Sequence, residues 1–367
     1  MVGEQENIFV ECGADLNHFK YKFRRKQFMW PSQTELFRQH YNNIGVYQTV
    51  MHYIDPVWMQ DDKGKVVIDA AKSLKFGNFY LDFDYPITSD EDYQKIKADV
   101  LKAIRYLTII LSIDISQIQF FFSGNKGIHL VVDAAVMGLK PHQALNEVYR
   151  DIAKDIAKFC ENETIDLRVY DNKRMFRMPN SVNKKSGLYK VPLTVKEFKE
   201  CKYQDILEIA KSPREIKAPT VIFSPKAKQA FEKYVDSWTE RLENVEKFDG
   251  KIKELKVLPP CIKRMQEKVF KETIDERNNS ATALTNFYFQ QGMEKEEALH
   301  RMTIWGEENC VPSLKRNEIE VVVNSVYRGH YRYGCQTFKE LSGVCEREIC
   351  PLFNDAFNVS EGEQNAE

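Results

Sequence analysis

The sequence has almost no net charge. Its 367 residues include 53 Lys and Arg against 54 Asp and Glu, which leaves a formal charge of −1. Nucleic-acid-binding domains usually present a basic surface, so an evenly spread charge of −1 would argue against a nucleic-acid partner. The charge is unevenly spread, because residues 20–26 are strongly basic and residues 355–367 are acidic. Neutrality therefore excludes a uniformly basic protein but not one with a local basic groove.

The chain also lacks a long apolar run, an export signal and an internal repeat. Its longest apolar stretch, residues 106–115, is interrupted by polar residues and is too short to span a bilayer. Residues 1–7 contain neither the basic region nor the apolar region of a secretory signal. We therefore expect a cytoplasmic protein with no membrane partner and with reduced cysteines. A hydrophobic content of 43% excludes disorder over most of the chain.

Hydrophobic periodicity divides the chain into two parts. Alternating apolar residues predict strands, and apolar residues spaced by three or four predict helices. The expected strands cover 45–53, 78–84, 117–122 and 128–133, with short ones near 165–170, 174–178 and 188–193, and the expected helices cover 92–111 and the segment after Pro141. These elements predict an α+β domain with a mixed or antiparallel sheet over 1–220. A helical linker over 221–256, an all-α domain over 257–354 and a disordered acidic tail over 355–367 are expected to follow.

The first chemical motif is an acidic pair at the end of the strand predicted over 78–84. Side chains alternate along a strand, so Asp82 and Asp84 point to the same face. Two carboxylates so placed can hold hard divalent cations that keep positions open for phosphate oxygens. A pair of solvated acids at an exposed strand end, or the Asp-x-Asp of a sugar-nucleotide transferase, would give the same pattern.

The second motif is a glycine-containing loop between two predicted strands. Gly124 and Gly127 permit a tight turn whose backbone amides can face an anion. Ser123 and Lys126 lie in the same loop, and His129 lies on the following strand. These groups together could hold a triphosphate, although a surface hairpin with a chance lysine would have the same composition.

The third motif is a basic segment that begins at Asp166. Between 167 and 190 it has seven basic residues and one acid, Asp171. Asp166 can supply a third carboxylate, and Arg177 and Lys185 can neutralise phosphates. Taken alone, the segment could equally be a solvated basic hairpin.

The order and content of the three motifs resemble the archaeo-eukaryotic primase superfamily. Its pattern is Asp-x-Asp, then Ser-Gly-x-Lys-Gly-x-His, then Asp-x-x-Val followed by Arg-x-Pro-x-Ser-x-His-x-Lys-x-Gly. Here the last part runs from Asp166 through Arg177, Ser181 and Lys185 to Gly187, and the resemblance covers roughly residues 20–195. It implies an RRM-like catalytic core and a nucleotidyltransferase.

The resemblance also implies roles for individual residues. Asp82, Asp84 and Asp166 would be the catalytic carboxylates and would hold two Mg²⁺ or Mn²⁺ ions. The nucleotide would be bound by Ser123, Gly124, Lys126, His129, Arg177, Ser181, Asn183 and Lys185. Asn183 departs from the family, which commonly has histidine there. No Cys/His cluster lies between the second and third motifs, so the zinc knuckle of cellular catalytic subunits is absent and the chain resembles the primase-polymerases of phages, plasmids and other mobile elements.

Three cysteines, Cys335, Cys345 and Cys350, crowd near the end of the chain without a Cys-x₂-Cys spacing. Cys261, Cys310 and His330 are the candidates for a fourth ligand. The region from Pro260-Cys261 to Cys335 resembles the C-terminal domain of the large primase subunit, which implies a [4Fe–4S] cluster on Cys261, Cys335, Cys345 and Cys350. Structural zinc and no metal are the alternatives. The other cysteines, at positions 12, 160, 201 and 310, are expected to be small buried residues.

These resemblances predict a single-chain DNA primase or primase-polymerase that copies single-stranded DNA. The expected partners are the template, NTP or dNTP, the nascent primer and a replicative helicase, which would make the protein nucleoid-associated. A primer-dependent polymerase that fills gaps or extends ends is the alternative within the same class. A catalytically silent single-strand-binding module for replication initiation is the alternative outside it.

Overall fold

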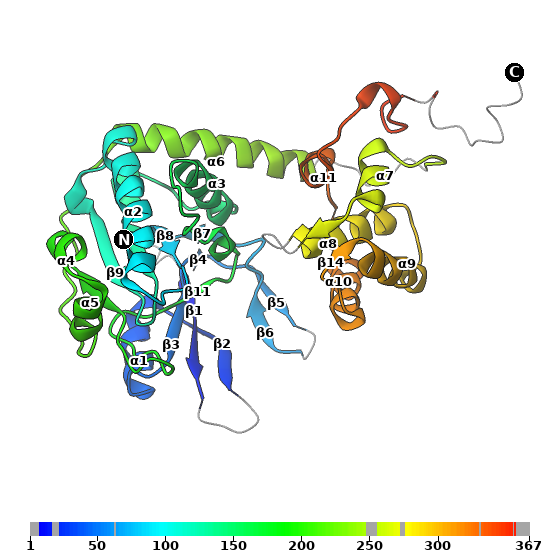
Figure 1. Ribbon diagram of the computed structural model, residues 1–367. Coiled ribbons are helices and arrows are strands. Elements are labelled where there is room, and N and C mark those ends of the chain that lie inside the picture. The colour runs from blue at the N-terminus through cyan, green and yellow to red at the C-terminus, as the bar shows by residue number, and fades with distance from the viewer. Residues whose placement is uncertain are drawn as a thin grey trace, which may run out of the picture. The chain divides into compact units, whose positions relative to one another are not determined.

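The computed structural model describes residues 7–16, 22–61, 64–246, 255–271, 276–329, 332–354 and 356. The chain forms two compact units, Met1–Lys247 and Phe248–Glu367. Figure 1 shows strands and helices interleaved in the first unit and mainly helices in the second. The acidic tail expected over 355–367 lies, apart from residue 356, outside the described residues, as does His330.

The first unit contains a six-stranded sheet in the order β11-β3-β1-β4-β7, with β2 paired to β1. Its strands are β1 (Ile8–Asp15), β2 (Phe23–Met29), β3 (Val46–Thr49), β4 (His52–Ile54), β7 (Leu74–Phe76) and β11 (Met175–Arg177). The segment predicted as one strand over 45–53 is two strands, which pair with different parts of β1. A separate hairpin joins β5 (Trp58–Gln60) and β6 (Val66–Ile68). The short helix α1 (Thr34–His40) precedes β3.

A second sheet of four antiparallel strands carries the first two motifs. Its order is β12-β9-β10-β8, formed by β8 (Phe79–Phe83), β9 (Ile118–Phe122), β10 (Ile128–Val132) and β12 (Val191–Leu193). Alternate apolar residues, such as Leu81, Phe120 and Leu130, are buried against the helices in one hydrophobic core. The opposite face of the same strands is therefore left for the polar residues of the motifs.

Two amphipathic helices cover the apolar face of this sheet. They are α2 (Asp90–Arg105), which continues as a π-helical turn over Tyr106–Ile110, and α3 (Leu145–Ala157). The side chain of Ser89 accepts a hydrogen bond from the Asp92 backbone amide and begins α2 with a capping box. The hydrophobic core holds Ile96 and Val100 of α2 and Val148 and Ile152 of α3. The short helices α4 (Val195–Glu200) and α5 (Tyr203–Ile209) follow β12.

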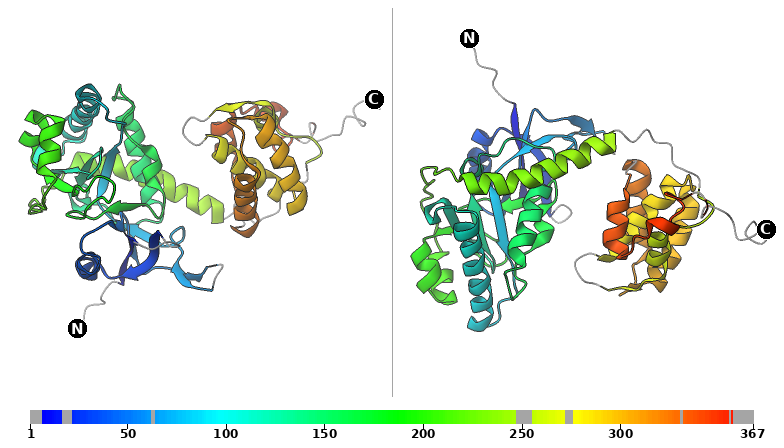
Figure 2. Two further views of the ribbon diagram at one scale, coloured as in Figure 1. Left: turned by 60° about the horizontal axis from the view of Figure 1, so that its bottom comes forward. Right: turned by 90° about the horizontal axis from the view of Figure 1, so that it is seen from above.

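The helix α6 (Pro225–Glu246) closes the first unit and packs along α3. Figure 2 shows α6 beside α3 in both views. Phe231 of α6 is fully buried against Phe79 and Tyr149, and the Trp238 indole donates to Asp151 at 2.9 Å. The segment expected as a helical linker is thus packed onto the first unit from Phe231 to Thr239, whose hydroxyl lies 3.0 Å from His142 Nε2.

The second unit is mainly helical. Its helices are α7 (Pro260–Glu267), α8 (Glu276–Gln290), α9 (Lys295–Glu308), α10 (Arg316–Gly329) and α11 (Cys335–Ser342). The two-residue strands β13 (Phe270–Lys271) and β14 (Cys310–Val311) pair in parallel. Its separate core includes Met265, Leu284 and Trp305. Together the units confirm the predicted α+β class followed by a helical C-terminal part, and no helix among the described residues is long and apolar enough to cross a membrane.

Candidate active site

The polar face of the four-stranded sheet carries a row of three aligned side chains. The strand register pairs Asp82 of β8 with His129 of β10, and His129 with Phe121 of β9. His129 Nε2 lies 3.4 Å from Asp82 Oδ1, and His129 is buried. The first and second motifs, far apart in sequence, therefore meet because their strands are neighbours.

Asp166 joins this row through the backbone. Its amide donates to the Asp82 carbonyl at 2.9 Å, and the Asp84 amide donates to the Thr164 carbonyl at 2.8 Å. The pairing is limited to a bridge between Phe83 and Ile165. The strand predicted over 165–170 was wrong beyond this bridge, because Leu167–Tyr170 form a 3₁₀ helix that the Asp166 carboxylate caps.

Two of the three carboxylates are paired with a cation. Asp84 Oδ1 lies 3.2 Å from Lys126 Nζ, and Asp166 Oδ1 lies 2.9 Å from Arg168 Nε. Asp82 instead lies beside His129, whose lowered pKa keeps the imidazole neutral. The charges of Asp84 and Asp166 are thus balanced by the protein's own side chains, and that of Asp82 is not.

The pKa values report how close the carboxylates are. Burial, with the nearby charges of Asp84 and Asp166, raises the pKa of Asp82 to about 7. Burial also opposes ionisation of Asp166, but hydrogen bonds from Arg168 outweigh it and lower the pKa of Asp166. Burial lowers the pKa of His129, and the charges of Lys190 and Arg177 lower it further. Asp84 and Asp166 therefore both disfavour the charged form of Asp82, and a divalent cation would relieve that repulsion.

The donor set suits a hard cation, although the side chains are not gathered around a metal position. In the described ranges, no three His, Cys, Asp or Glu side chains are arranged as a metal-holding group. Carboxylate oxygens are nevertheless the ligands that Mg²⁺ and Mn²⁺ prefer. The carboxylates of Asp82, Asp84 and Asp166 fit such ions. To bind them, each carboxylate has to separate from its present partner, which is His129, Lys126 or Arg168 respectively.

The glycine loop of the second motif is closed on itself and lies directly against the acids. The Ser123 amide donates to the Gly127 carbonyl at 2.9 Å, and the Gly127 amide donates to Ser123 Oγ at 3.0 Å. Gly124 has a positive φ of 82°, and a Cβ there would lie 2.9 Å from the Leu188 carbonyl oxygen. A Cβ on Gly127 would lie only 3.1 Å from the Phe83 carbonyl oxygen, and 3.5 Å from Asp82 Oδ1. Glycine at both positions therefore lets the loop approach its neighbours closely.

The third motif enters the site from the other sheet. Arg177 of β11 lies opposite Tyr47 of β3 and donates to its hydroxyl at 2.8 Å. The Phe176 ring packs on His129 with centroids 4.6 Å apart. The two sheets of the first unit thus contact each other at this point, and Arg177 lies near enough to His129 to influence its charge.

Three other predicted nucleotide ligands have mainly structural contacts. Ser181 is fully buried, and its Oγ accepts from the Val46 amide at 2.9 Å. Asn183 Oδ1 accepts from the Lys185 amide at 2.9 Å, which closes a turn. Lys185 is exposed on that turn, and the described contacts do not join its amine to the carboxylates. These residues shape the segment beside the site rather than meeting the acids.

The sequence analysis counted Lys190 only within the basic segment. The structure buries it to 4% exposure, with its Nζ 5.2 Å from the Phe176 ring centroid and 5.5 Å from that of Phe121. Burial lowers the pKa of Lys190 to about 7, while the charge of Asp82 opposes this shift. The alternation of side chains along a strand could have predicted which face of the sheet Lys190 points to. Lys190 lies two residues before Pro192, which pairs with Phe121, so both point to the same face.

The C-terminal cysteines are free and lie close to one another. Cys261 is in the first turn of α7 and Cys335 begins α11, and these helices pack together. Burial raises the pKa of Cys261 to about 11, and the charges of Cys350 and Cys335 contribute. The pKa of Cys335 is raised by burial and then by Cys350 and Cys345. Thiolates are ligands that soft metals prefer. Among the described residues, however, these cysteines are not arranged as a metal-holding group.

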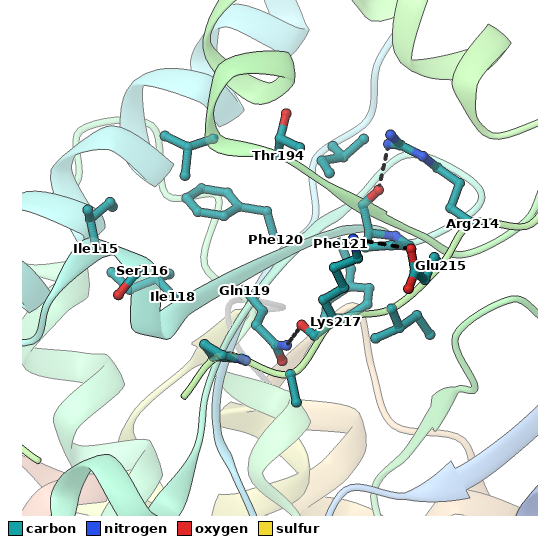
Figure 3. A pocket seen from close by; sticks show the side chains of 16 residues that line it. Ile115, Ser116, Ile118, Gln119, Phe120, Phe121, Thr194, Arg214, Glu215 and Lys217 are labelled. Carbon is teal, nitrogen blue, oxygen red and sulfur yellow. Dashed lines mark hydrogen bonds and ion pairs between the residues drawn. The ribbon is translucent and has the colours of Figure 1, made fainter. Parts of the chain in front are cut away.

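A separate cavity of about 550 Å³ lies at the β9–β12 edge. Figure 3 shows its wall, where the segment that includes Arg214 and Lys217 crosses β9. The Gln119 amide donates to the Lys217 carbonyl at 3.1 Å and ties this segment to the strand. Phe121 lines the cavity and also contacts the Lys190 ammonium, so the cavity adjoins the site.

Comparison with known proteins gives one family match. Residues 270–332, which lie in the second unit, match the family described as Primase C terminal 1 (PriCT-1). The four cysteines expected as metal ligands lie outside this segment. No curated protein matches the chain. Among solved structures, the crystal structure of primase RepB′ aligns over 92% of this chain and 93% of that chain, at 12% identity and a TM-score of 0.32.

Proposed function

We propose that this chain is a DNA-dependent primase or primase-polymerase of the archaeo-eukaryotic type, which synthesises primers on single-stranded DNA. The observation that carries the proposal is the convergence of Asp82, Asp84 and Asp166 beside Lys126 and His129. The PriCT-1 match in the second unit supports the same class.

In this proposal the three carboxylates hold two Mg²⁺ or Mn²⁺ ions. When bound, the ions would lower the pKa of the attacking 3′-hydroxyl and stabilise the pentavalent phosphorus and the leaving pyrophosphate. Lys126 and His129 would turn from Asp84 and Asp82 to the triphosphate. The backbone amides of the Ser123–Gly127 loop and the Arg177 guanidinium would orient it.

The deciding experiment is synthesis on an unprimed single-stranded DNA circle with labelled NTP or dNTP. The wild-type protein should make product with Mn²⁺ or Mg²⁺, and Asp82→Ala and Asp84→Ala should abolish it. Asp236→Asn, an exposed acid on α6, is the matched control and should retain activity.

Two other outcomes would refute the primase assignment. Activity confined to primed templates would identify the protein as a primer-dependent polymerase. Binding of single-stranded DNA without synthesis under either condition would leave the non-catalytic module.

We further propose that Cys261, Cys335, Cys345 and Cys350 hold a [4Fe–4S] cluster, with structural zinc as the alternative. The proximity of Cys335 and Cys350 to Cys261, and of Cys345 and Cys350 to Cys335, supports this, as does the absence of disulfides among the four. Anaerobic purification followed by iron, sulfide and zinc analysis tests the proposal. Stoichiometric zinc in a colourless protein would reject the cluster.

A further inference from the structure

The buried Lys190 amine forms no ion pair with a described side chain, and Asp82 attracts it only from beyond ion-pair distance. No hydrogen bond to its Nζ is found among the described residues, and its closest recorded partners are the rings of Phe121 and Phe176. Burying an ammonium group without a paired charge costs free energy, and ring contacts offset only part of that cost. The fold therefore keeps a charge where stability alone would favour an apolar side chain.

The position of Lys190 is tightly fixed. Its amide donates to the Ser181 carbonyl at 3.0 Å, and its carbonyl accepts from the Asn180 amide at 2.7 Å. It directly precedes Val191, which pairs with Phe122, so it lies next to Ser123 at the start of the glycine loop. A Cβ on Gly124 would lie 3.1 Å from the Lys190 amide nitrogen, which places the loop against this residue.

The charged groups around Lys190 belong to three strands. Asp82 of β8 attracts its charge, while Arg177 of β11 repels it. His129 of β10 is in turn influenced by Lys190. Lys190 thus adjoins the cation-rich part of the site, on the side of the glycine loop away from β8.

We propose that Lys190 is a further nucleotide-binding residue, whose ammonium holds a phosphate of the incoming nucleoside triphosphate. The inference rests on the proposed function, because it takes the ligand to be a triphosphate. The triphosphate would supply the ion-pair partner that the buried ammonium lacks among the described side chains. A merely structural role, in which the lysine only packs on the two rings, is the competing explanation.

The test compares Lys190→Met with Lys190→Arg and with Lys196→Met. Lys196 is a matched control because its side chain is 80% exposed on α4. A non-hydrolysable deoxynucleoside triphosphate and the same nucleoside without phosphates are titrated into each protein by calorimetry, with Mg²⁺ held constant. Thermal unfolding without ligand is measured in parallel.

We expect Lys190→Met to bind the triphosphate about 10-fold more weakly or worse, as for the loss of one charged hydrogen bond. Its melting temperature should be unchanged or higher, Lys190→Arg should bind more tightly than Lys190→Met, and Lys196→Met should match the wild type.

An affinity of Lys190→Met within twofold of the wild type would overturn the inference. A weaker affinity together with a lower melting temperature would also overturn it, since that result indicates a structural role. If the wild-type protein binds no triphosphate, the proposed function itself fails.

Discussion

At the scale of residues, many of the charges that suggest nucleic-acid binding are already engaged within the protein. Arg168 pairs with Asp166, Arg174 with Asp171, and Arg177 with the Tyr47 hydroxyl. The local charge counted along the sequence therefore overstates the charge that a template would meet. A ligand at the site has to compete with these internal pairs, or replace them.

The buried Asp82 carboxyl should make stability fall with rising pH in the absence of metal. The pKa of Asp82 is about 7 in the folded protein against an ordinary value of 3.8, so between these values the folded protein holds a proton that the unfolded chain has lost. Stability from this group is therefore lost as the pH rises from about 4 to 7. Asp82→Asn removes the titrating group. The melting temperature of this variant should therefore decrease less with rising pH than that of the wild-type protein. The measurement is thermal unfolding in chelator from pH 4 to 8, and equal pH slopes for both proteins would contradict the prediction.

The glycine loop gives a second residue-scale prediction. Gly124→Ala should destabilise the first unit by about 2–3 kcal/mol. The added Cβ would clash with the Leu188 carbonyl oxygen, and alanine would also have to adopt an unfavourable positive φ. Gly187→Ala is the matched control, since Gly187 has a φ of 73° with nothing within 4 Å. It should cost only about 1 kcal/mol, from backbone strain alone. Urea unfolding measures both, and equal losses would show that the close approach does not matter.

At the scale of elements, neighbouring strands rather than sequence proximity assemble the site. The register of β8, β10 and β9 aligns Asp82, His129 and Phe121. The bridge between Phe83 and Ile165 adds the third carboxylate, and β11 brings Arg177 from the other sheet. The helices α2 and α3 cover only the apolar face, which leaves the other face to the polar side chains.

The packing of α6 predicts that it contributes to the stability of the first unit. Phe231→Ala removes a ring that is buried against Phe79 and Tyr149, and should cost about 3–5 kcal/mol. Lys233→Ala, on the exposed side of α6, should change stability by less than about 0.5 kcal/mol. Hydrogen exchange of α3 amides in the intact protein measures the effect. Unchanged protection of α3 in Phe231→Ala would show that α6 is only loosely attached.

At the scale of the whole molecule, the two units have separate cores and carry separate candidate sites. The carboxylates belong to the first unit and the four cysteines to the second. Loss of one site should therefore leave the fold of the other unit intact. This separation allows each proposal to be tested independently in the full chain.

The cysteine site gives the prediction at this scale. Cys350→Ser should lower the iron or zinc content and the melting temperature of the second unit, because metal binding to a folded site adds to stability. Cys201→Ser, in the first unit, is the control and should retain the metal. Elemental analysis and calorimetry of anaerobically prepared protein measure both effects. A full metal complement in Cys350→Ser would remove this residue from the ligand set.

The sequence by itself determined the fold class and most elements around the site. Strands at 78–84, 117–122 and 128–133 and the helix beginning near 92 have strong local periodicity, and the structure has them within a few residues. Local pattern failed near 165–170, where the Asp166 carboxylate caps a 3₁₀ helix instead of continuing a strand. The alternation of side chains along a strand is also enough to predict that Asp82 and Asp84 share one face.

Only the tertiary structure decided which of the motif residues meet. It placed Asp166 beside Asp82 through a backbone bridge, turned Ser181 and Asn183 to structural hydrogen bonds, and buried Lys190 beside Ser123. Sequence periodicity specifies the direction of a side chain relative to its own strand or helix. Which side chains then share a site depends on strand order and on contacts between the two sheets, and these are set by packing between segments far apart in the chain.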